Sequence, residues 1–165
     1  MNDQTIDDVR RLLLRELAAF RREIEQFDDD EAIWQTVPGV TNSAGNLTIH
    51  VCGGLQHFLG AVLGSTGYVR DRDAEFTSRN QTRAEVCALV DDTMHVVDRT
   101  LTALDGAALA RPIATPLGQD VRTGIFLIHL ATHASFHLGQ AGYLRRVLTG
   151  KGTSVAPVPL APLVD

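Results

Sequence analysis

Apolar residues recur at steps of three and four in four separate segments of the chain, which is the periodicity of amphipathic α-helices. We expect the first helix at residues 5–26 and the second from a cap at Asn42 or Ser43 to Gly64 or Gly67. The third helix should begin at a capping box at Thr82 and end near residue 105, and the fourth should span 120 or 121 to 148. Four such helices predict an all-α fold, a four-helix bundle.

The length of 165 residues suits one domain. We expect residues 1–150 to form a single four-helix domain. Residues 151–165 contain Pro157, Pro159 and Pro162, so we expect an extended tail that lies along the bundle or crosses to a partner. The connections between helices one and two and between helices three and four each exceed a dozen residues, so simple up-down-up-down hairpins are not required.

Charge and composition exclude several classes of partner. The chain has 20 acidic and 15 basic side chains, a net charge of −5, and lacks a large Lys/Arg cluster, so nucleic acid is not an expected partner. The charged N-terminus does not resemble a secretory signal, and no apolar run approaches the ~20 residues that cross a bilayer. We therefore expect a cytoplasmic protein with no membrane partner, in which Cys52 and Cys87 serve as small apolar fillers.

Three histidines stand four residues apart in the last helix and form a column on one face: His129, His133 and His137. Two adjacent members can hold one divalent ion, but the outer two are separated by two turns, roughly 12 Å. A third ligand must come from another helix, and the candidates are His50, His57 and His95, of which His95 lies off the buried stripe and should be on the surface. The alternative is that these histidines are core residues whose ring nitrogens are hydrogen bonded.

The last helix lacks an acidic residue beside its histidines, which limits the reactions that such a site could catalyse. Position 134 is alanine, so the glutamate of His-Glu-x-x-His zinc peptidases is missing, and no residue can be assigned as a general base. Three neutral histidines leave a divalent ion its full charge and an open position, which acidifies a bound water or thiol.

Two further stretches require an explanation. Gly45, Gly53, Gly54 and Gly60 lower the helix propensity of the second segment, which makes sense if that helix approaches a neighbour or a ligand closely. Residues 68–76 alternate in charge and form either a plain exposed connection or a loop ordered over the end of the bundle.

The chain resembles the DinB superfamily, four-helix proteins that include YfiT-like metal-dependent hydrolases and thiol-dependent S-transferases. The resemblance covers most of residues 1–150 and is carried by three stretches. These are residues 46–50 (Asn-Leu-Thr-Ile-His) with 55–60, residues 70–76 (Arg-Asp-Arg-Asp-Ala-Glu-Phe), and residues 133–140, whose His-x-x-x-His-x-Gly-Gln pattern is the most specific.

The resemblance implies an up-down-down-up bundle that holds a divalent ion, nickel or zinc, with His50, His133 and His137 as ligands. His57 and His129 are then left to pack beside the site or to orient its ligands. The resemblance also implies a homodimer.

Asn46 lies one helical turn before His50, and Gln140 lies almost one turn after His137, so both are candidate orienting groups beside the cofactor.

The leading hypothesis is an enzyme in which the ion activates a low-molecular-weight thiol (S-transferase type) or water (hydrolase type) against a small electrophilic substrate. The transferase form rests on analogy with mycothiol- and bacillithiol-dependent enzymes of this group. Two alternatives remain, a non-catalytic, stress-linked metal-binding bundle and a plain bundle with buried histidines.

Overall fold

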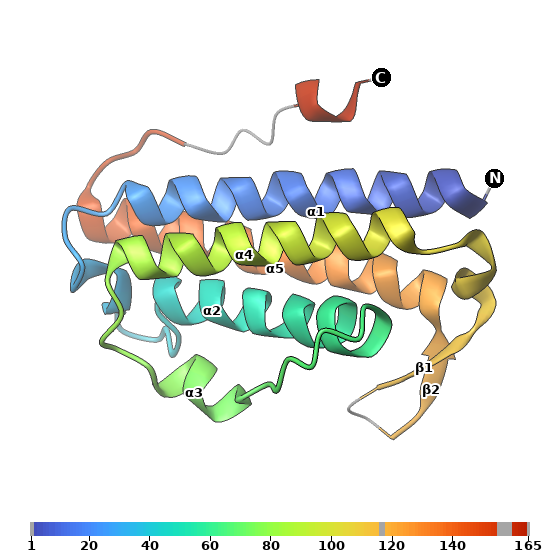
Figure 1. The fold of residues 1–165 in the computed structure, drawn as a ribbon. Coiled ribbons are helices and arrows are strands. Elements are labelled where there is room, and N and C mark those ends of the chain that lie inside the picture. The colour runs from blue at the N-terminus through green and yellow to red at the C-terminus, as the bar shows by residue number, and fades with distance from the viewer. Residues whose placement is uncertain (1, 116–117, 155–159, 165) are drawn as a thin grey trace.

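Four long helices dominate the computed structural model, which describes residues 2–115, 118–154 and 160–164 (Figure 1). The long helices are α1 (Asn2–Glu25), α2 (Ala44–Leu55), α4 (Arg83–Ala103) and α5 (Thr123–Thr149). A short helix, α3 (Arg72–Thr77), follows α2, and two short strands, β1 (Pro112–Ala114) and β2 (Asp120–Arg122), precede α5. Single turns of 3-10 helix occupy Ala32–Trp34, Gly106–Ala110 and Ala161–Leu163.

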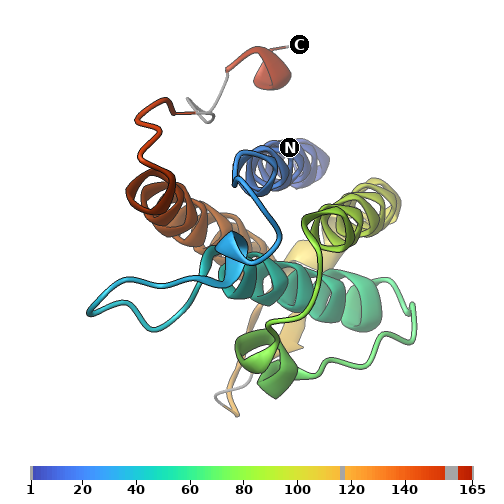
Figure 2. The same cartoon turned by 90° about the vertical axis from the view of Figure 1, so that its left-hand side faces the viewer.

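The long helices form the predicted up-down-down-up bundle. Helix α1 packs against α4 and α5, and α2 packs against the same two helices from the opposite side (Figure 2). Helices α2 and α4 run in one direction, while α1 and α5 run in the other (Figure 1). The prediction of an all-α four-helix bundle is therefore confirmed.

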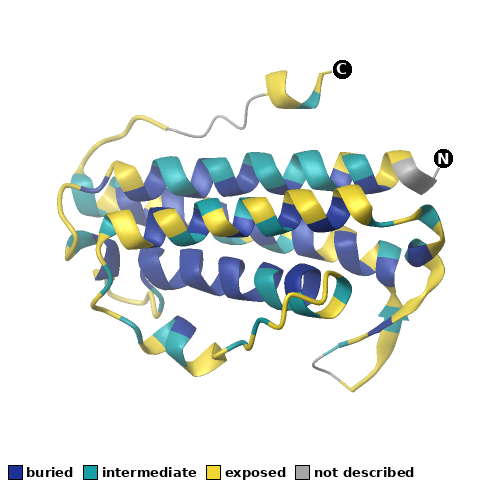
Figure 3. Ribbon diagram, viewed as in Figure 1, coloured by how far each residue is buried: buried dark blue, intermediate teal, exposed yellow. Residues whose placement is uncertain are grey.

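The core lies where the inner faces of the four helices meet (Figure 3). The apolar stripe predicted for the first helix is buried along its whole length: Ile6, Val9, Leu13, Leu17, Phe20, Ile24 and Phe27. Helix α2 differs from the others because all of its residues are buried. It is enclosed by α4, α5, α3 and the turn Ala32–Trp34, so any polar group that it carries must find a partner inside the protein.

Glycines allow α2 to be enclosed so closely. A Cβ atom at Gly45 would lie 2.6 Å from the ring of Trp34, and one at Gly60 would lie 3.1 Å from Val96. The Trp34 indole N–H donates to the carbonyl of Gln81 at 2.9 Å, which fixes the ring against the helix. The expectation that this glycine-rich helix approaches its neighbours closely is confirmed.

Both predicted N-terminal caps are present. The Ser43 hydroxyl accepts from the Asn46 N–H at 3.1 Å and begins α2, and Thr82 forms a capping box with Glu85 at the start of α4. The second helix ends at Gly64, as predicted, but its last part, Gln56–Leu63, is π-helical. Segments of π-helix are rare and occur often at functional sites.

The predicted start of the fourth helix at Asp120 or Val121 is wrong. Residues Asp120–Arg122 pair antiparallel with Pro112–Ala114, with Val121 opposite Ile113, so their backbone groups bond to a strand. Helix α5 begins at Thr123, whose N–H and hydroxyl both donate to the carbonyl of Arg111 at 2.9 Å. Consequently Asp120 does not lie in the first turn of the helix.

The two arginines at the end of α5 have different roles. The Nε of Arg146 donates to the carbonyl of Gly142 at 3.1 Å, and its positive charge in the last turn complements the negative end of the helix dipole. Arg145 instead points into the bundle, where it is 1% exposed and its Nε donates to Glu23 Oε2 at 2.6 Å. Its other nitrogens donate to the carbonyls of Lys151 and Thr153, which holds the chain that follows the helix.

The C-terminal tail is only partly described. Residues 155–159 and 165, part of the segment expected to be extended, lie outside the described residues, whereas Ala161–Leu163 forms a helical turn that contacts α1. Cys52 and Cys87 are free and buried, as predicted for small fillers. None of the described helices combines the length and the apolar character that a membrane span requires.

The buried pair of Glu23 and Arg145 gives a first prediction. We expect Glu23→Ala to lower the free energy of unfolding by about 3–5 kcal/mol, because it leaves the Arg145 guanidinium buried without a counterion. The control is Asp28→Ala, which removes the partner of Lys151 from a pair whose side chains are 48% and 60% exposed and should cost less than about 1 kcal/mol. Urea denaturation of the three proteins measures the difference, and equal losses would contradict it.

Candidate metal centre

The structure brings together three histidines from two helices. His50 comes from α2, and His133 and His137 come from one face of α5. Their ligand nitrogens all lie within 4.8 Å of one another. The Nε2 atom of His133 is 3.3 Å from that of His50 and 3.1 Å from that of His137. Three ring nitrogens from the two packed helices thus converge on one point.

This spacing fits a divalent ion. Two nitrogens that each lie 2.0–2.1 Å from a tetrahedral zinc ion are about 3.3 Å apart. The two short separations in the cluster match that value closely. Within the described part of the chain the cluster contains three residues, which is the number of protein ligands typical of a zinc site with an open position.

The carboxylate of Glu75 orients the first histidine. Glu75 lies on α3, is 2% exposed, and its Oε2 lies 2.9 Å from Nδ1 of His50. A carboxylate accepts hydrogen bonds, so the proton of this imidazole is on Nδ1 and its Nε2 lone pair faces the cluster. A histidine that donates to a carboxylate in this way is typical of metal ligands.

Arg70 balances the charge of Glu75. Its Nε donates to Oε1 at 2.6 Å and its Nη2 donates to Oε2 at 2.8 Å, a bidentate pair. Burial alone would raise the pKa of Glu75, but the hydrogen bonds from His50 and Arg70 outweigh it and hold that pKa below its ordinary value. Glu75 is therefore ionised at neutral pH and remains an acceptor for His50.

Gln140 plays the same part for His137. Its Oε1 lies 2.7 Å from Nδ1 of His137, which directs the Nε2 lone pair of that ring to the cluster. Asn46, the other candidate orienting group, does not contact a clustered histidine and acts on His50 through Glu75. Its amide donates to the carbonyls of Glu75 and Ser78 at 2.9 and 3.2 Å, so it holds the backbone of the segment that carries Glu75.

His133 and His137 are neutral at physiological pH. Burial, followed by the neighbouring histidines, lowers the pKa of His133 to about 4. Burial also lowers the pKa of His137, although its hydrogen bond with Gln140 opposes the shift. Because metals bind the neutral ring, these imidazoles are ready to act as ligands without first losing a proton.

The remaining histidines lie outside the cluster. The ring centroid of His129 is 5.8 Å from that of His133, and its side chain is exposed at the next turn of the column. His57 packs against Phe58 at a centroid distance of 4.7 Å. His95 is exposed on α4, as predicted.

Sequence reasoning did not assign roles to Arg70 and Glu75. The charged stretch that contains them is ordered and packs against α2, so it is not a plain exposed connection, and it lies beside that helix instead of over the end of the bundle (Figure 1). Gly53 was the feature of the sequence that could have indicated their approach to α2, because a Cβ atom there would lie 2.9 Å from the carboxylate carbon of Glu75. A glycine inside a buried helix marks the place where another group must approach.

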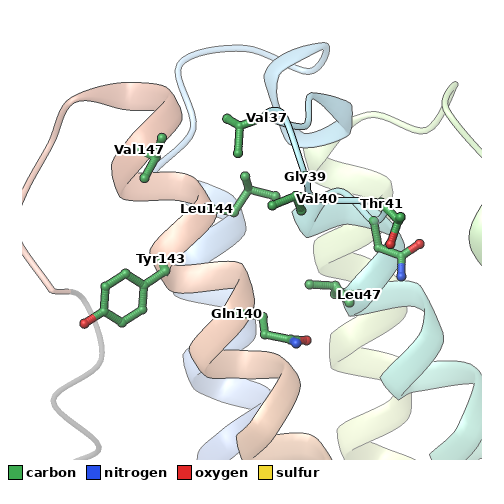
Figure 4. A pocket seen from close by; sticks show the side chains of 10 residues that line it. Val37, Gly39, Val40, Thr41, Leu47, Gln140, Tyr143, Leu144 and Val147 are labelled. Carbon is green, nitrogen blue, oxygen red and sulfur yellow. The ribbon is translucent and has the colours of Figure 1, made fainter.

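Two cavities lie on either side of the histidine cluster, along the groove between α2 and α5. The first, of about 400 Å³, lies between the loop 37–42 and the C-terminal half of α5 and includes Gln140, Tyr143 and Leu47 (Figure 4). The second, of about 300 Å³, lies toward the start of α5 and includes His50, His133 and Arg72. The second cavity therefore reaches the cluster directly, whereas the first meets it only through Gln140, which is hydrogen bonded to His137.

Comparisons with known proteins agree with the fold. A sequence model described as the DinB superfamily matches residues 12–141. A crystal structure of a conserved protein from Enterococcus faecalis has the same fold, with a TM-score of 0.70 and 16% sequence identity over 87% of this chain and 96% of that one. No curated protein matches the chain in sequence.

Metal binding gives the second prediction. We expect the wild-type protein to bind one nickel or zinc ion per chain, and His50→Ala, His133→Ala and His137→Ala each to abolish stoichiometric binding, as measured by calorimetric titration. His129→Ala removes the fourth imidazole of the region but no converging nitrogen, so it should bind the metal as wild type does. Loss of binding in His129→Ala alone, with the other variants unaffected, would show that the ligand set is wrong.

The third prediction concerns the space at Gly53. We expect Gly53→Ala to displace the Glu75 carboxylate from His50 and to weaken nickel binding by about 10–100-fold, the usual effect of losing a group that orients a ligand. The control is Gly139→Ala, because a Cβ atom at Gly139 meets nothing within 4 Å. That change should leave nickel binding intact and raise the free energy of unfolding by about 0.5–1 kcal/mol through helix propensity. Equal nickel affinities in the two variants would contradict the prediction.

Proposed function

The chain belongs to the DinB superfamily, and from this membership together with the three-histidine cluster we propose that it is a divalent-metal-dependent enzyme. In this proposal the metal, nickel or zinc, activates a low-molecular-weight thiol, or water, for attack on a small electrophilic substrate. The observation that carries the proposal is the convergence of three imidazole nitrogens beside a cavity that His50 and His133 line.

The ligand set favours a reactive site over a structural one. Structural zinc sites are usually closed by four protein ligands, whereas catalytic sites keep one position for water or substrate. Three neutral imidazoles do not reduce the charge of a divalent ion, so the ion would lower the pKa of a thiol or water that binds beside them.

The residues around the histidines supply orientation and charge balance. Glu75 and Gln140 fix the tautomers of His50 and His137, so that both rings are oriented before a ligand arrives. Arg70 neutralises Glu75, so the pair adds no net charge to the site. An anionic thiolate is therefore attracted by the positive charge of the ion without opposition from a free carboxylate.

The two cavities support a reaction with two substrates. A transferase must hold a thiol and an electrophile on either side of the reacting atoms, and the groove between α2 and α5 offers one cavity toward each end. A hydrolase would need only one of them. The transferase form is therefore the form that we favour.

We also propose a homodimer, in line with the family resemblance. Helix α5 exposes large apolar side chains along its outer face, among them Ile125, Phe136, Tyr143 and Val147, which are 52–70% exposed. Such a face is typical of a surface that another chain covers.

The fourth prediction tests the enzyme. The protein, purified without a histidine tag and loaded with nickel or zinc, should transfer cysteine, glutathione, mycothiol or bacillithiol to monochlorobimane faster than the uncatalysed reaction, as measured by fluorescence. Chelation and His137→Ala should reduce the rate to background, because both remove the metal. His95→Ala, which changes an exposed residue on α4, should keep the wild-type rate.

Two results would count against this proposal. A rate that is equal with and without metal would exclude the metal-dependent reaction. Stoichiometric metal binding without transfer or hydrolysis of any tested substrate would favour the non-catalytic metal-binding bundle instead.

A further inference from the structure

The cavity beside His50 and His133 has a character suited to one class of substrate. Most of its wall is apolar and comes from α2, the π-helical segment that follows it, and α5: Val51, Gly54, Leu55, Phe58, Phe126 and Leu130. At about 300 Å³ it can take a small molecule. Its polar wall consists of three histidines and two arginines.

The two arginines of this wall are not equivalent. Arg70 is bound on two sides by the Glu75 carboxylate, so its charge is already balanced. Arg72 lies 5.3 Å from the centroid of the Phe76 ring, which orients the guanidinium without neutralising it. In the part of the chain that the structure describes, no carboxylate lies within ion-pair distance of Arg72.

No acidic side chain lines the cavity, although acidic residues outnumber basic ones in the whole chain by 20 to 15. The buried Glu75 lies behind His50 and Arg70 and cancels the charge of Arg70. The cavity is thus left with the positive charge of Arg72, to which a bound divalent ion would add. Arg72 is exposed, so water solvates its charge until an anionic ligand takes the place of that water.

The other cavity lacks this feature. The residues that line it are uncharged, with Asn42, Thr41, Gln140 and Tyr143 as its polar groups. The groove therefore has one neutral end and one cationic end, and an anionic substrate is better accommodated at the cationic end.

We propose that the cavity beside His50 and His133 binds an electrophile that carries a carboxylate on an apolar body, with Arg72 as the residue that binds the carboxylate. This inference rests on the proposed function and names its substrate class. A planar guanidinium matches the two oxygens of a carboxylate, and the apolar wall accommodates the rest of the molecule. Inorganic phosphate has no apolar body and would leave the apolar wall without a contact, so the wall favours a carboxylate on an apolar molecule.

The test uses cinnamate, in which a carboxylate, a conjugated double bond and a phenyl ring are combined, and its neutral counterpart cinnamamide. Calorimetric titration of the metal-free full-length protein isolates the contribution of Arg72, because a carboxylate cannot then bind to the ion. We expect cinnamate to bind about fivefold more tightly than cinnamamide, a gain that the exposure of Arg72 to solvent limits.

Arg72→Gln should remove the preference for cinnamate. The matched control is Arg99→Gln, which deletes the same charge from an exposed position on α4 and should retain the preference. Arg72→Lys, which keeps the charge but not the planar fork, should fall between wild type and Arg72→Gln. Nickel binding should be equal to wild type in Arg72→Gln, which shows that α3 and Glu75 are still in place.

Three outcomes would overturn the inference: equal binding of cinnamate and cinnamamide to wild type, an equal loss in Arg72→Gln and Arg99→Gln, or displacement of cinnamate by inorganic phosphate at equal concentration. These outcomes are separate from a failure of the proposed function. If the protein binds no nickel or catalyses no transfer, but still prefers cinnamate through Arg72, the enzyme proposal fails and the carboxylate site remains.

Discussion

The buried carboxylate of Glu75 is the interaction on which the rest of the site depends. A charge that is 2% exposed is stable inside a protein only if it is paired and hydrogen bonded, and Arg70 and His50 meet both conditions. The same bonds hold α3 against α2 and direct the Nε2 lone pair of His50 to His133. The Glu75 carboxylate thus does two things. It forms the buried ion pair that holds α3 in place, and it orients the ligand His50.

Helix α2 can support this arrangement because it is enclosed on several sides. Gly53 leaves room for the Glu75 carboxylate, whose carbon would lie 2.9 Å from a Cβ atom there. Asn46 lies in the first turn of the same helix, and its amide donates to the carbonyls of Glu75 and Ser78. The low helix propensity of this segment is therefore offset by contacts that only small or polar residues permit.

The groove between α2 and α5 joins the cluster to its surroundings. Helices α2 and α5 are antiparallel, so the start of α2 lies near the end of α5. For the same reason, one cavity lies on each side of the histidines. In the proposed reaction the thiol and the electrophile would approach the cluster from opposite ends of the groove. Arg72 would bind the carboxylate of the electrophile at the end beside His50 and His133.

The sequence by itself determined the helices, the caps at Ser43 and Thr82, and the pair His133 and His137, because each depends on residues within a few turns of one another. It placed His95 on the surface but left the third member of the cluster open between His50 and His57, and only the resemblance to a family selected His50. Tertiary structure decided what no local pattern contains: the approach of Glu75 and Arg70 to His50, the burial of Arg145, and the strand that delays the start of α5. These features depend on distances between segments far apart in the chain, which packing alone sets.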